Sequence, residues 1–376
     1  MAKIDIKSII RKYNLQKITI GVLGGHSALD VCSGAKKYGF NTVVVCQKGR
    51  EKTYDKYFKI RKKGGKGCVS DIILVDKFSD ITKESVQKKL RSLNTIFIHN
   101  RYFWVYCNFE EIEKNFSVPI FGLREGVRLE ERDQPNNQYE LLKKAGIRIP
   151  KIYGAPSEID RLVIVKVNEA ARGYERAFFF ANSEMSYYKE AGARIKNGHI
   201  TREALNKAVI EEYIVGAHIN LNFFYSPLSR EVELMGTDTR RQTNLDGFLR
   251  LPAHEQAMIR RYMEPKIIET GHYSVTMKES LIEKAFDLGE RFVKTLKKVV
   301  PPGIIGPFAL QGAVAADDGK EDFVIFDVSM RIPGSPGTKF TPYSGYLYGE
   351  SLSYGERIAM EIKEAVDQDR LNELLT

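Results

Sequence analysis

The sequence has few cysteines and no long apolar segment. Only four of the 376 residues are cysteines, and none are paired at metal-ligand spacing, which predicts reduced core thiols at Cys32, Cys46, Cys68 and Cys107. No apolar run approaches the roughly 20 residues of a membrane-spanning helix. The amino-terminal residues lack the apolar segment of a signal peptide, and no internal repeat or low-complexity segment is found. These absences argue against a membrane protein, a secreted disulfide-rich domain and a repeat protein, and they predict a cytoplasmic protein.

The chain is long and basic. Its 376 residues exceed what one core usually serves, so two or three packed subdomains are expected. A formal net charge of +10 favours an anionic partner, either a nucleic acid or a small polyanion such as a nucleotide. Because no nucleic-acid-binding motif is found, small anionic ligands are the preferred interpretation.

The amino-terminal part is predicted to form a βαβ unit with a parallel sheet. A strand over Lys17–Leu23 is followed by the turn Gly24–Ser27, a helix over Ala28–Tyr38 and a strand over Asn41–Cys46. The turn exposes backbone N–H groups at a helix start, which is a ready anion site, and His26 adds a donor there. Many such turns hold no ligand, so the glycine turn alone is weak support for a site.

A lysine lies inside a short apolar strand in the middle of the chain. The strand is Leu162–Val167, and lysine is seldom placed in such a strand without a partner, so Lys166 is a candidate site residue. A polar loop, Asn168–Arg176, and a return strand, Ala177–Ala181, follow it. We therefore expect a flap that closes over phosphate groups.

Two polar features follow this flap. A strand over Val209–Val215 carries Glu211 and Glu212, whose side chains are expected on opposite faces. The long polar stretch Gly236–Pro252 is more typical of a site than of a linker. Other elements are expected as a helical link over Glu125–Gly146, helices over Glu203–Val209, Lys278–Lys298 and 354–374, and a hairpin over Ile219–Tyr225 and Glu231–Met235.

A late hairpin is the strongest candidate for a metal site. The runs Phe308–Ala315 and Phe323–Val328 flank the turn Asp317–Lys320, and each run carries one polar residue, Gln311 or Asp327. Folding about the turn places Gln311 opposite residue 326, give or take one residue, so both side chains can reach one site. Two hard oxygen ligands suit Mg²⁺. The alternative is that Asp327 caps a strand end and Gln311 bonds backbone.

The sequence resembles the ATP-grasp ligases and, within them, the archaeal formate-dependent FAICAR synthetases (5-formaminoimidazole-4-carboxamide ribonucleotide synthetases). The resemblance extends over almost the whole chain. The stretches that carry it include KGR at Lys48–Arg50, VIVK at Val163–Lys166, IEEYIVG at Ile210–Gly216, VELMGTD at Val232–Asp238 and VPPGIIGPFALQ at Val300–Gln311.

The resemblance implies an α/β (α+β) ATP-grasp fold with an amino-terminal βαβ subdomain. It implies subdomains over 1–124, 125–215 with the phosphate flap, and 216–376 with the metal hairpin. The implied enzyme is a ligase of purine (IMP) biosynthesis that uses ATP, with Mg²⁺ or Mn²⁺, to formylate AICAR through formyl phosphate. Formate and AICAR are the implied partners, with no nucleic acid or membrane, and a homo-oligomer is expected.

The resemblance also implies roles for individual residues. By position, Lys166 holds ATP phosphates, while Glu211, Glu212 and Tyr213 contact adenine and ribose. Gln311 binds the metal with Asp327 beside it, where the family has Glu. The substrate's phosphate end is assigned to His26 and Ser27, the pair in the glycine turn.

The sequence departs from the family pattern at the flap and the substrate pocket. The flap has one glycine, Gly173, where several are expected, which leaves Arg172 as a side-chain substitute for phosphate contact. Tyr102 follows Arg101 where the family has Gly-Ser, Gln242 replaces an acid near ATP, and His272 replaces an Asn near the substrate. Two alternatives therefore remain: a paralogue that joins another carboxylate or amine, and a catalytically silent nucleotide-binding homologue.

Overall fold

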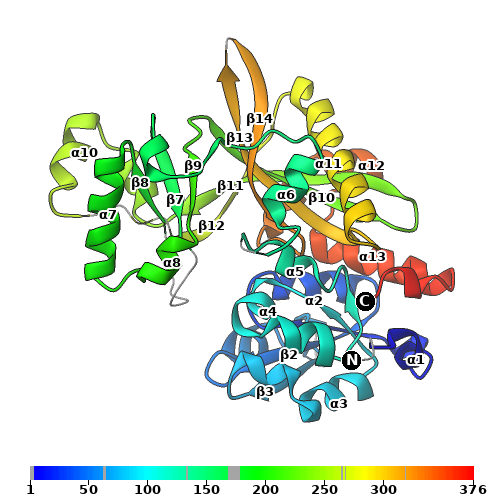
Figure 1. The fold of residues 1–376 in the computed structure, drawn as a ribbon. Helices are drawn as coiled ribbons and strands as arrows, with labels where there is room; N and C mark the ends of the chain where they lie inside the picture. Colours follow the sequence, from blue (N-terminus) through cyan, green and yellow to red (C-terminus); the bar gives the residue numbers. More distant parts are fainter. Residues whose placement is uncertain are drawn as a thin grey trace.

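Three sheets organise the molecule. The structure, a computed structural model, describes residues 4–61, 65–132, 134–167, 178–263, 266, 268–317 and 319–376. Figure 1 shows an α/β part at the bottom and, above it, a small sheet at the left beside a large sheet. Within these ranges no helix is both long enough and apolar enough to cross a membrane.

The first sheet is parallel, with the order β3-β2-β1-β4-β5. Its strands are β1 (Thr19–Leu23), β2 (Asn41–Gln47), β3 (Asp71–Val75), β4 (Thr95–Ile98) and β5 (Ile120–Phe121). The helices beside it are α1 (Ile6–Ile10), α2 (Ala28–Lys37), α3 (Glu84–Ser92) and α4 (Arg101–Tyr106). Every residue of β1 is buried, as expected for a parallel strand covered on both faces. The predicted βαβ unit is confirmed.

The second sheet is antiparallel, with the order β6-β9-β7-β8. Its strands are β6 (Ile152–Tyr153), β7 (Val163–Lys166), β8 (Phe178–Ala181) and β9 (Val209–Glu212), and its helices are α7 (Glu184–Lys196) and α8 (Arg202–Asn206). The link from the first sheet contains α5 (Gly126–Leu129) and α6 (Gln138–Lys144). The predicted helix over Glu203–Val209 was too long, because Val209 already pairs with Lys166 in the sheet. The predicted flap, with Arg172, lies outside the described residues.

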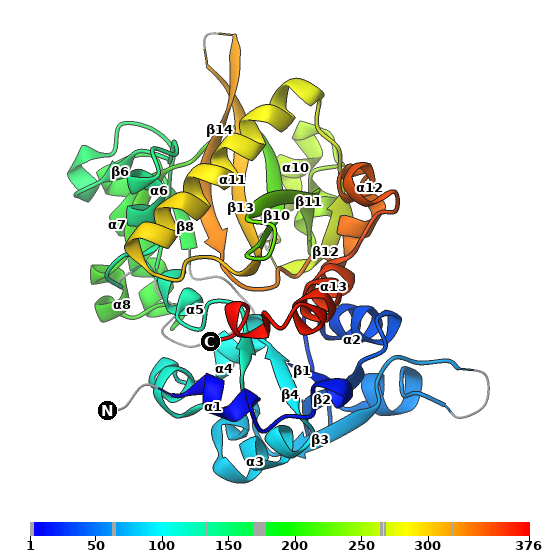
Figure 2. The ribbon, with the colours of Figure 1, turned by 90° about the vertical axis from the view of Figure 1, so that its right-hand side faces the viewer.

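The third sheet, with the order β12-β11-β10-β13-β14, is the largest. It comprises β10 (Ala217–Ser226), β11 (Glu231–Gln242), β12 (Glu269–Ser274), β13 (Gly306–Asp317) and β14 (Lys320–Ser329), with α9 (Leu245–Phe248), α10 (Ala253–Ile259) and α11 (Glu279–Val299). Figure 2 shows α11 lying across this sheet. The buried apolar face of α11 packs on the strands, and Phe292 of that face stacks on Phe308. β11 extends beyond the predicted Met235 because its polar end pairs with β12.

The carboxyl-terminal residues return to the first sheet. After α12 (Tyr343–Tyr348), helix α13 (Tyr354–Asp367) packs against α2, and Leu375 forms a bridge with Phe121 of β5. The predicted helix over 354–374 was too long. It ends at Asp367 because Asp369 adopts φ 55°, which an α-helix cannot contain.

Candidate functional site

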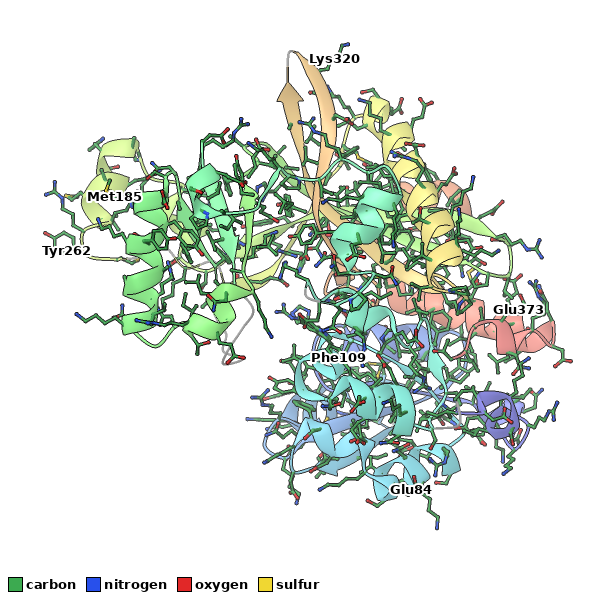
Figure 3. All side chains as sticks on the ribbon, viewed as in Figure 1. Glu84, Phe109, Met185, Tyr262, Lys320 and Glu373 are labelled. Atoms are coloured by element: carbon green, nitrogen blue, oxygen red, sulfur yellow. The ribbon has the colours of Figure 1, made fainter. Side chains whose placement is uncertain are left out.

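A cavity of about 910 Å³ lies where the three sheets meet. Its wall takes residues from the turn after β1, from the small sheet and from all five strands of the large sheet. Phe109, labelled in Figure 3, belongs to the wall and lies at the top of the amino-terminal part. The sequence-predicted residues in the wall are His26, Lys166, Glu211, Glu212, Tyr213, Gln242, His272, Gln311 and Asp327.

Lys166 is a largely buried cation in the cavity wall. Its Nζ forms an ion pair with Glu211, donates to the Phe326 carbonyl at 3.2 Å and lies 3.4 Å from the Tyr139 hydroxyl. That hydroxyl donates to Oε2 of Glu211 at 2.6 Å. Burial lowers the pKa of Lys166, and the Glu211 carboxylate offsets part of this effect. The prediction that the strand lysine has a partner is confirmed.

The two neighbouring carboxylates of β9 have different surroundings. Glu211 is buried against Lys166, whereas Glu212 is half-buried and binds the Arg161 guanidinium at 3.1 Å. This matches the predicted alternation along the strand. Beside them, the rings of Tyr213 and Phe180 lie 5.2 Å apart at the cavity wall, which gives an apolar surface suited to a flat base.

Gln311 and Asp327 face each other across β13 and β14. The register pairs these two residues directly, and it shifts immediately after Gln311, so that Phe326 is the extra residue of a β-bulge. The predicted juxtaposition within one residue is confirmed. The bulge also presents the Phe326 carbonyl to Lys166.

Both side chains have arginine partners. Oε1 of Gln311 accepts a hydrogen bond from Arg240, and Nε2 donates to Oγ of Ser329 at 2.9 Å. The Asp327 carboxylate lies 3.8 Å from the Arg132 guanidinium and 3.9 Å from that of Arg240. Two positive groups therefore converge on the pair, in a position where they can also meet phosphate oxygens.

The pair fits a metal that takes few protein ligands. In the described ranges, no group of three or more His, Cys, Asp and Glu side chains is placed to hold a metal ion. Mg²⁺ commonly uses one or two protein oxygens together with water and phosphates, which matches one amide and one carboxylate oxygen. Oε1 of Gln311 accepts a hydrogen bond from Arg240, so a metal there would use the second lone pair of this oxygen or displace Arg240.

His272 lies between two carboxylates of the large sheet, Asp238 of β11 and Glu269 of β12. Nδ1 bonds Asp238, and Nε2 lies 2.8 Å from Oε1 of Glu269. Asp238 is fully buried and also accepts from Asn220 at 2.9 Å and Asn222 at 2.5 Å. Burial acts to lower the pKa of His272, but the hydrogen bonds to both carboxylates outweigh it and raise the pKa to about 9. The imidazole is therefore charged at neutral pH.

His26 connects the glycine turn to this cluster. Its Nε2 lies 3.7 Å from Oε1 of Glu269, and its ring packs on Gly334 so closely that a Cβ there would lie 2.2 Å from Nδ1. Ser27 Oγ donates to the Pro333 carbonyl at 2.7 Å. These two contacts hold the turn against the loop at 333–334. The Ser27 hydroxyl is used in this contact, because it donates to the Pro333 carbonyl.

Tyr102 lies behind the turn. Its ring packs on Gly25, where a Cβ would lie 2.3 Å from the ring. Asn100, just before it, donates to the carbonyls of Leu23 and His26, both at 2.9 Å. Tyr102 and Ser27 therefore support the turn from outside the cavity wall.

Several charged residues of the wall were not predicted. Three of them lie on segments whose sequence shows no motif or apolar periodicity that would mark a site: Glu130, Arg132 and Arg331. Only folding of the chain brings them to the cavity. Arg240 lies in the polar stretch over Gly236–Pro252, which was expected to form a site. Its guanidinium pairs with Glu269 of β12 at 3.3 Å.

Comparisons with known proteins agree with this architecture. Family models described as "Protein of unknown function (DUF1246)" and "Domain of unknown function (DUF1297)" match residues 20–153 and 186–376. The IMP biosynthesis protein PurP from Thermococcus kodakaraensis superposes with a TM-score of 0.70, at 26% identity, over 95% of this chain and 100% of that one. An ADP complex of N5-carboxyaminoimidazole ribonucleotide synthetase, PurK, superposes with a TM-score of 0.56 at 12% identity, over 90% of this chain and 78% of that one. The fold is the ATP-grasp fold, as predicted.

A curated relative matches the sequence from end to end. The 5-formaminoimidazole-4-carboxamide-1-(beta)-D-ribofuranosyl 5'-monophosphate synthetase of Methanothermobacter thermautotrophicus is 41% identical over 375 residues, which cover 99% of this chain and 98% of the relative. With this identity over the full length, the chain belongs to the family of 5-formaminoimidazole-4-carboxamide ribonucleotide synthetases.

Proposed function

We propose that the protein is an ATP-dependent carbon–nitrogen ligase that joins formate to the 5-amino group of 5-aminoimidazole-4-carboxamide ribonucleotide (AICAR). The product is FAICAR, an intermediate of purine (IMP) biosynthesis. The 41% identity to a synthetase named for this product supports the reaction, and the ADP complex of a structural neighbour supports ATP as the nucleotide.

One observation carries the proposal: a single cavity is lined both by residues assigned to ATP and by residues assigned to the substrate. Lys166 and Tyr213 come from the small sheet and its edge, His26 from the turn after β1, and His272 from β12. Gln311 of β13 and Asp327 of β14 line the same cavity. A nucleotide and a second anionic substrate can therefore bind in one cavity, where their reacting groups can be brought together.

The reaction has two displacement steps. A formate oxygen attacks the γ-phosphorus of ATP, and ADP leaves with the electrons of the broken P–O bond. The AICAR amine then attacks the carbon of formyl phosphate, the C–O bond breaks, and phosphate leaves as the nitrogen loses a proton. Both steps need positive charge near phosphate oxygens more than they need a covalent catalyst.

The cavity supplies that charge. Lys166, Arg132 and Arg240 face the same space as Gln311 and Asp327, and these last two would hold Mg²⁺ or Mn²⁺. A bound metal would neutralise phosphate charge.

Further assignments remain predictions. Glu211, Glu212, Tyr213 and Gln242 are assigned to ATP, as is Arg172 of the flap. His26, Ser27, Tyr102 and His272 are assigned to the substrate end, where Ser27 and Tyr102 act by holding the turn. The subdomain limits 1–124, 125–215 and 216–376, a cytoplasmic location and a homo-oligomer also remain predictions.

The test is ADP release with Mg-ATP, formate and AICAR, each omitted in turn. ADP that forms only with all three present supports the proposal. ADP that forms with another amine or carboxylate in a substrate panel, but not with AICAR and formate, indicates a paralogue. Tight Mg-ATP binding without ADP release for any pair indicates a silent nucleotide-binding homologue.

A further inference from the structure

Ser335 is a residue of the cavity wall whose hydroxyl is buried and unused. The residue is 1% exposed, and its Oγ has no hydrogen-bond partner among the described residues. A buried hydroxyl without a partner loses its hydrogen bonds to water, which is unfavourable unless a ligand replaces them. Because Ser335 lines the cavity, a ligand there can supply the missing acceptor.

The turn that precedes α2 offers further unused donors next to Ser335. Within the described part of the chain, the backbone N–H groups of Gly25, His26 and Ser27 donate to no other group. They precede a helix of ten residues, whose amino-terminal end attracts negative charge. The packing of His26 on Gly334 brings this turn against the residue that precedes Ser335.

Two arginine side chains lie near His26 and the turn. Arg101 and Arg331 line the cavity, and their charges act on His26. Burial lowers the pKa of His26, the Glu269 carboxylate opposes this shift, and the guanidiniums of Arg331 and Arg101 reinforce it. The lowered pKa favours the neutral imidazole, while the arginines supply the positive charge.

We infer that Ser335 is a specificity residue whose hydroxyl, with the turn amides at Gly25–Ser27, binds the phosphate monoester of the acceptor nucleotide. This inference rests on the proposed function and adds a residue that the family resemblance did not assign. A phosphate monoester presents several acceptor oxygens, which matches one hydroxyl, a row of amides and two guanidiniums.

The test compares two acceptors on two variants. Binding of AICAR and of its riboside, which lacks the phosphate, is measured by calorimetry without ATP or formate on wild type and S335A. We expect S335A to bind AICAR about 10- to 100-fold more weakly, because a hydrogen bond to a charged group is lost. Riboside affinity should be the same in both proteins. Inorganic phosphate should compete with AICAR in wild type and more weakly in S335A.

Thr338→Val is the matched control. Thr338 is 1% exposed and its Oγ1 has no partner in the described ranges, but it does not line the cavity. This variant should bind AICAR as wild type does. Equal AICAR affinity in wild type and S335A would overturn the inference, and so would an equal loss for AICAR and riboside.

A measurement on wild type keeps the inference testable if S335A does not fold. AICAR, but not the riboside, should slow hydrogen exchange at the amides of Gly25–Ser27, and unchanged exchange would contradict the site. The two proposals also fail separately. Normal AICAR binding without ADP release would contradict the proposed function alone, and full turnover by S335A at low AICAR would contradict the phosphate site alone.

Discussion

Replacing His272 with asparagine tests the charged cluster that this residue forms with Asp238 and Glu269. His272 is 10% exposed in its side chain and bonds Asp238 and Glu269 through its two ring nitrogens. Asparagine can still donate one hydrogen bond to Asp238, but it carries no charge and does not titrate. The variant therefore removes the positive charge of His272 and the pH dependence that comes with it, while a polar side chain remains beside Asp238.

The magnitude follows from the pKa. The ordinary value of 6.5 is raised to about 9 in the folded protein. At about 1.4 kcal/mol per tenfold change in proton affinity, this corresponds to about 3 kcal/mol of stability. Because the folded pKa is the higher one, this stability is fully present below pH 6.5 and is lost as the pH rises through 9.

Two assays measure this effect. Nuclear magnetic resonance of the six histidines, with H272N for assignment, should show one signal that titrates near pH 9. Calorimetric melting of both proteins should show that the stability advantage of wild type over H272N shrinks between pH 6.5 and 9.5. Parallel melting profiles over this range, with no histidine titrating above pH 8, would refute the reasoning.

Three further substitutions test other parts of the account. Lys166→Met should weaken ATP binding at least about tenfold by calorimetry, since a charged hydrogen bond is lost and Glu211 stays buried; unchanged affinity would remove the assigned role. Asp327→Asn should abolish turnover and weaken Mg-ATP binding in a magnesium titration; surviving activity would contradict the metal assignment. Gly34→Ala should lower stability by about 1–3 kcal/mol, because its Cβ would lie 2.0 Å from the Gly355 backbone. The matched helical change Gly192→Ala, with nothing within 4 Å, should instead stabilise by about 0.5–1 kcal/mol.

Turn residues and apolar periodicity predicted the late hairpin well, and the ends of some elements less well. The Asp-Gly turn fixed the late hairpin, and with it the juxtaposition of Gln311 and Asp327. The bulge at Phe326 moved the register by one residue, and no sequence signal marks it. The helix over 354–374 was too long because the backbone at Asp369 turns left-handed, a conformation that the apolar periodicity does not encode.

The composition of the cavity was only partly predictable. Lys166 was found because a lysine in an apolar strand needs a partner, but that partner, Glu211, lies on another strand. Arg132 and Arg331 show no pattern in the chain and meet the site only through packing of distant segments. The sequence thus identifies a residue such as Lys166, whose charge is unusual in its strand. It does not identify residues such as Arg132 and Arg331, which reach the cavity only in the folded chain.

The most direct test of the central claim is transfer of oxygen from formate to phosphate. The enzyme is incubated with Mg-ATP, AICAR and ¹⁸O-labelled formate, and the released phosphate is analysed by mass spectrometry. If ATP phosphorylates formate, each FAICAR formed is accompanied by one phosphate that carries one ¹⁸O. Unlabelled phosphate would contradict the ligase mechanism, and labelled phosphate without FAICAR would contradict AICAR as the acceptor.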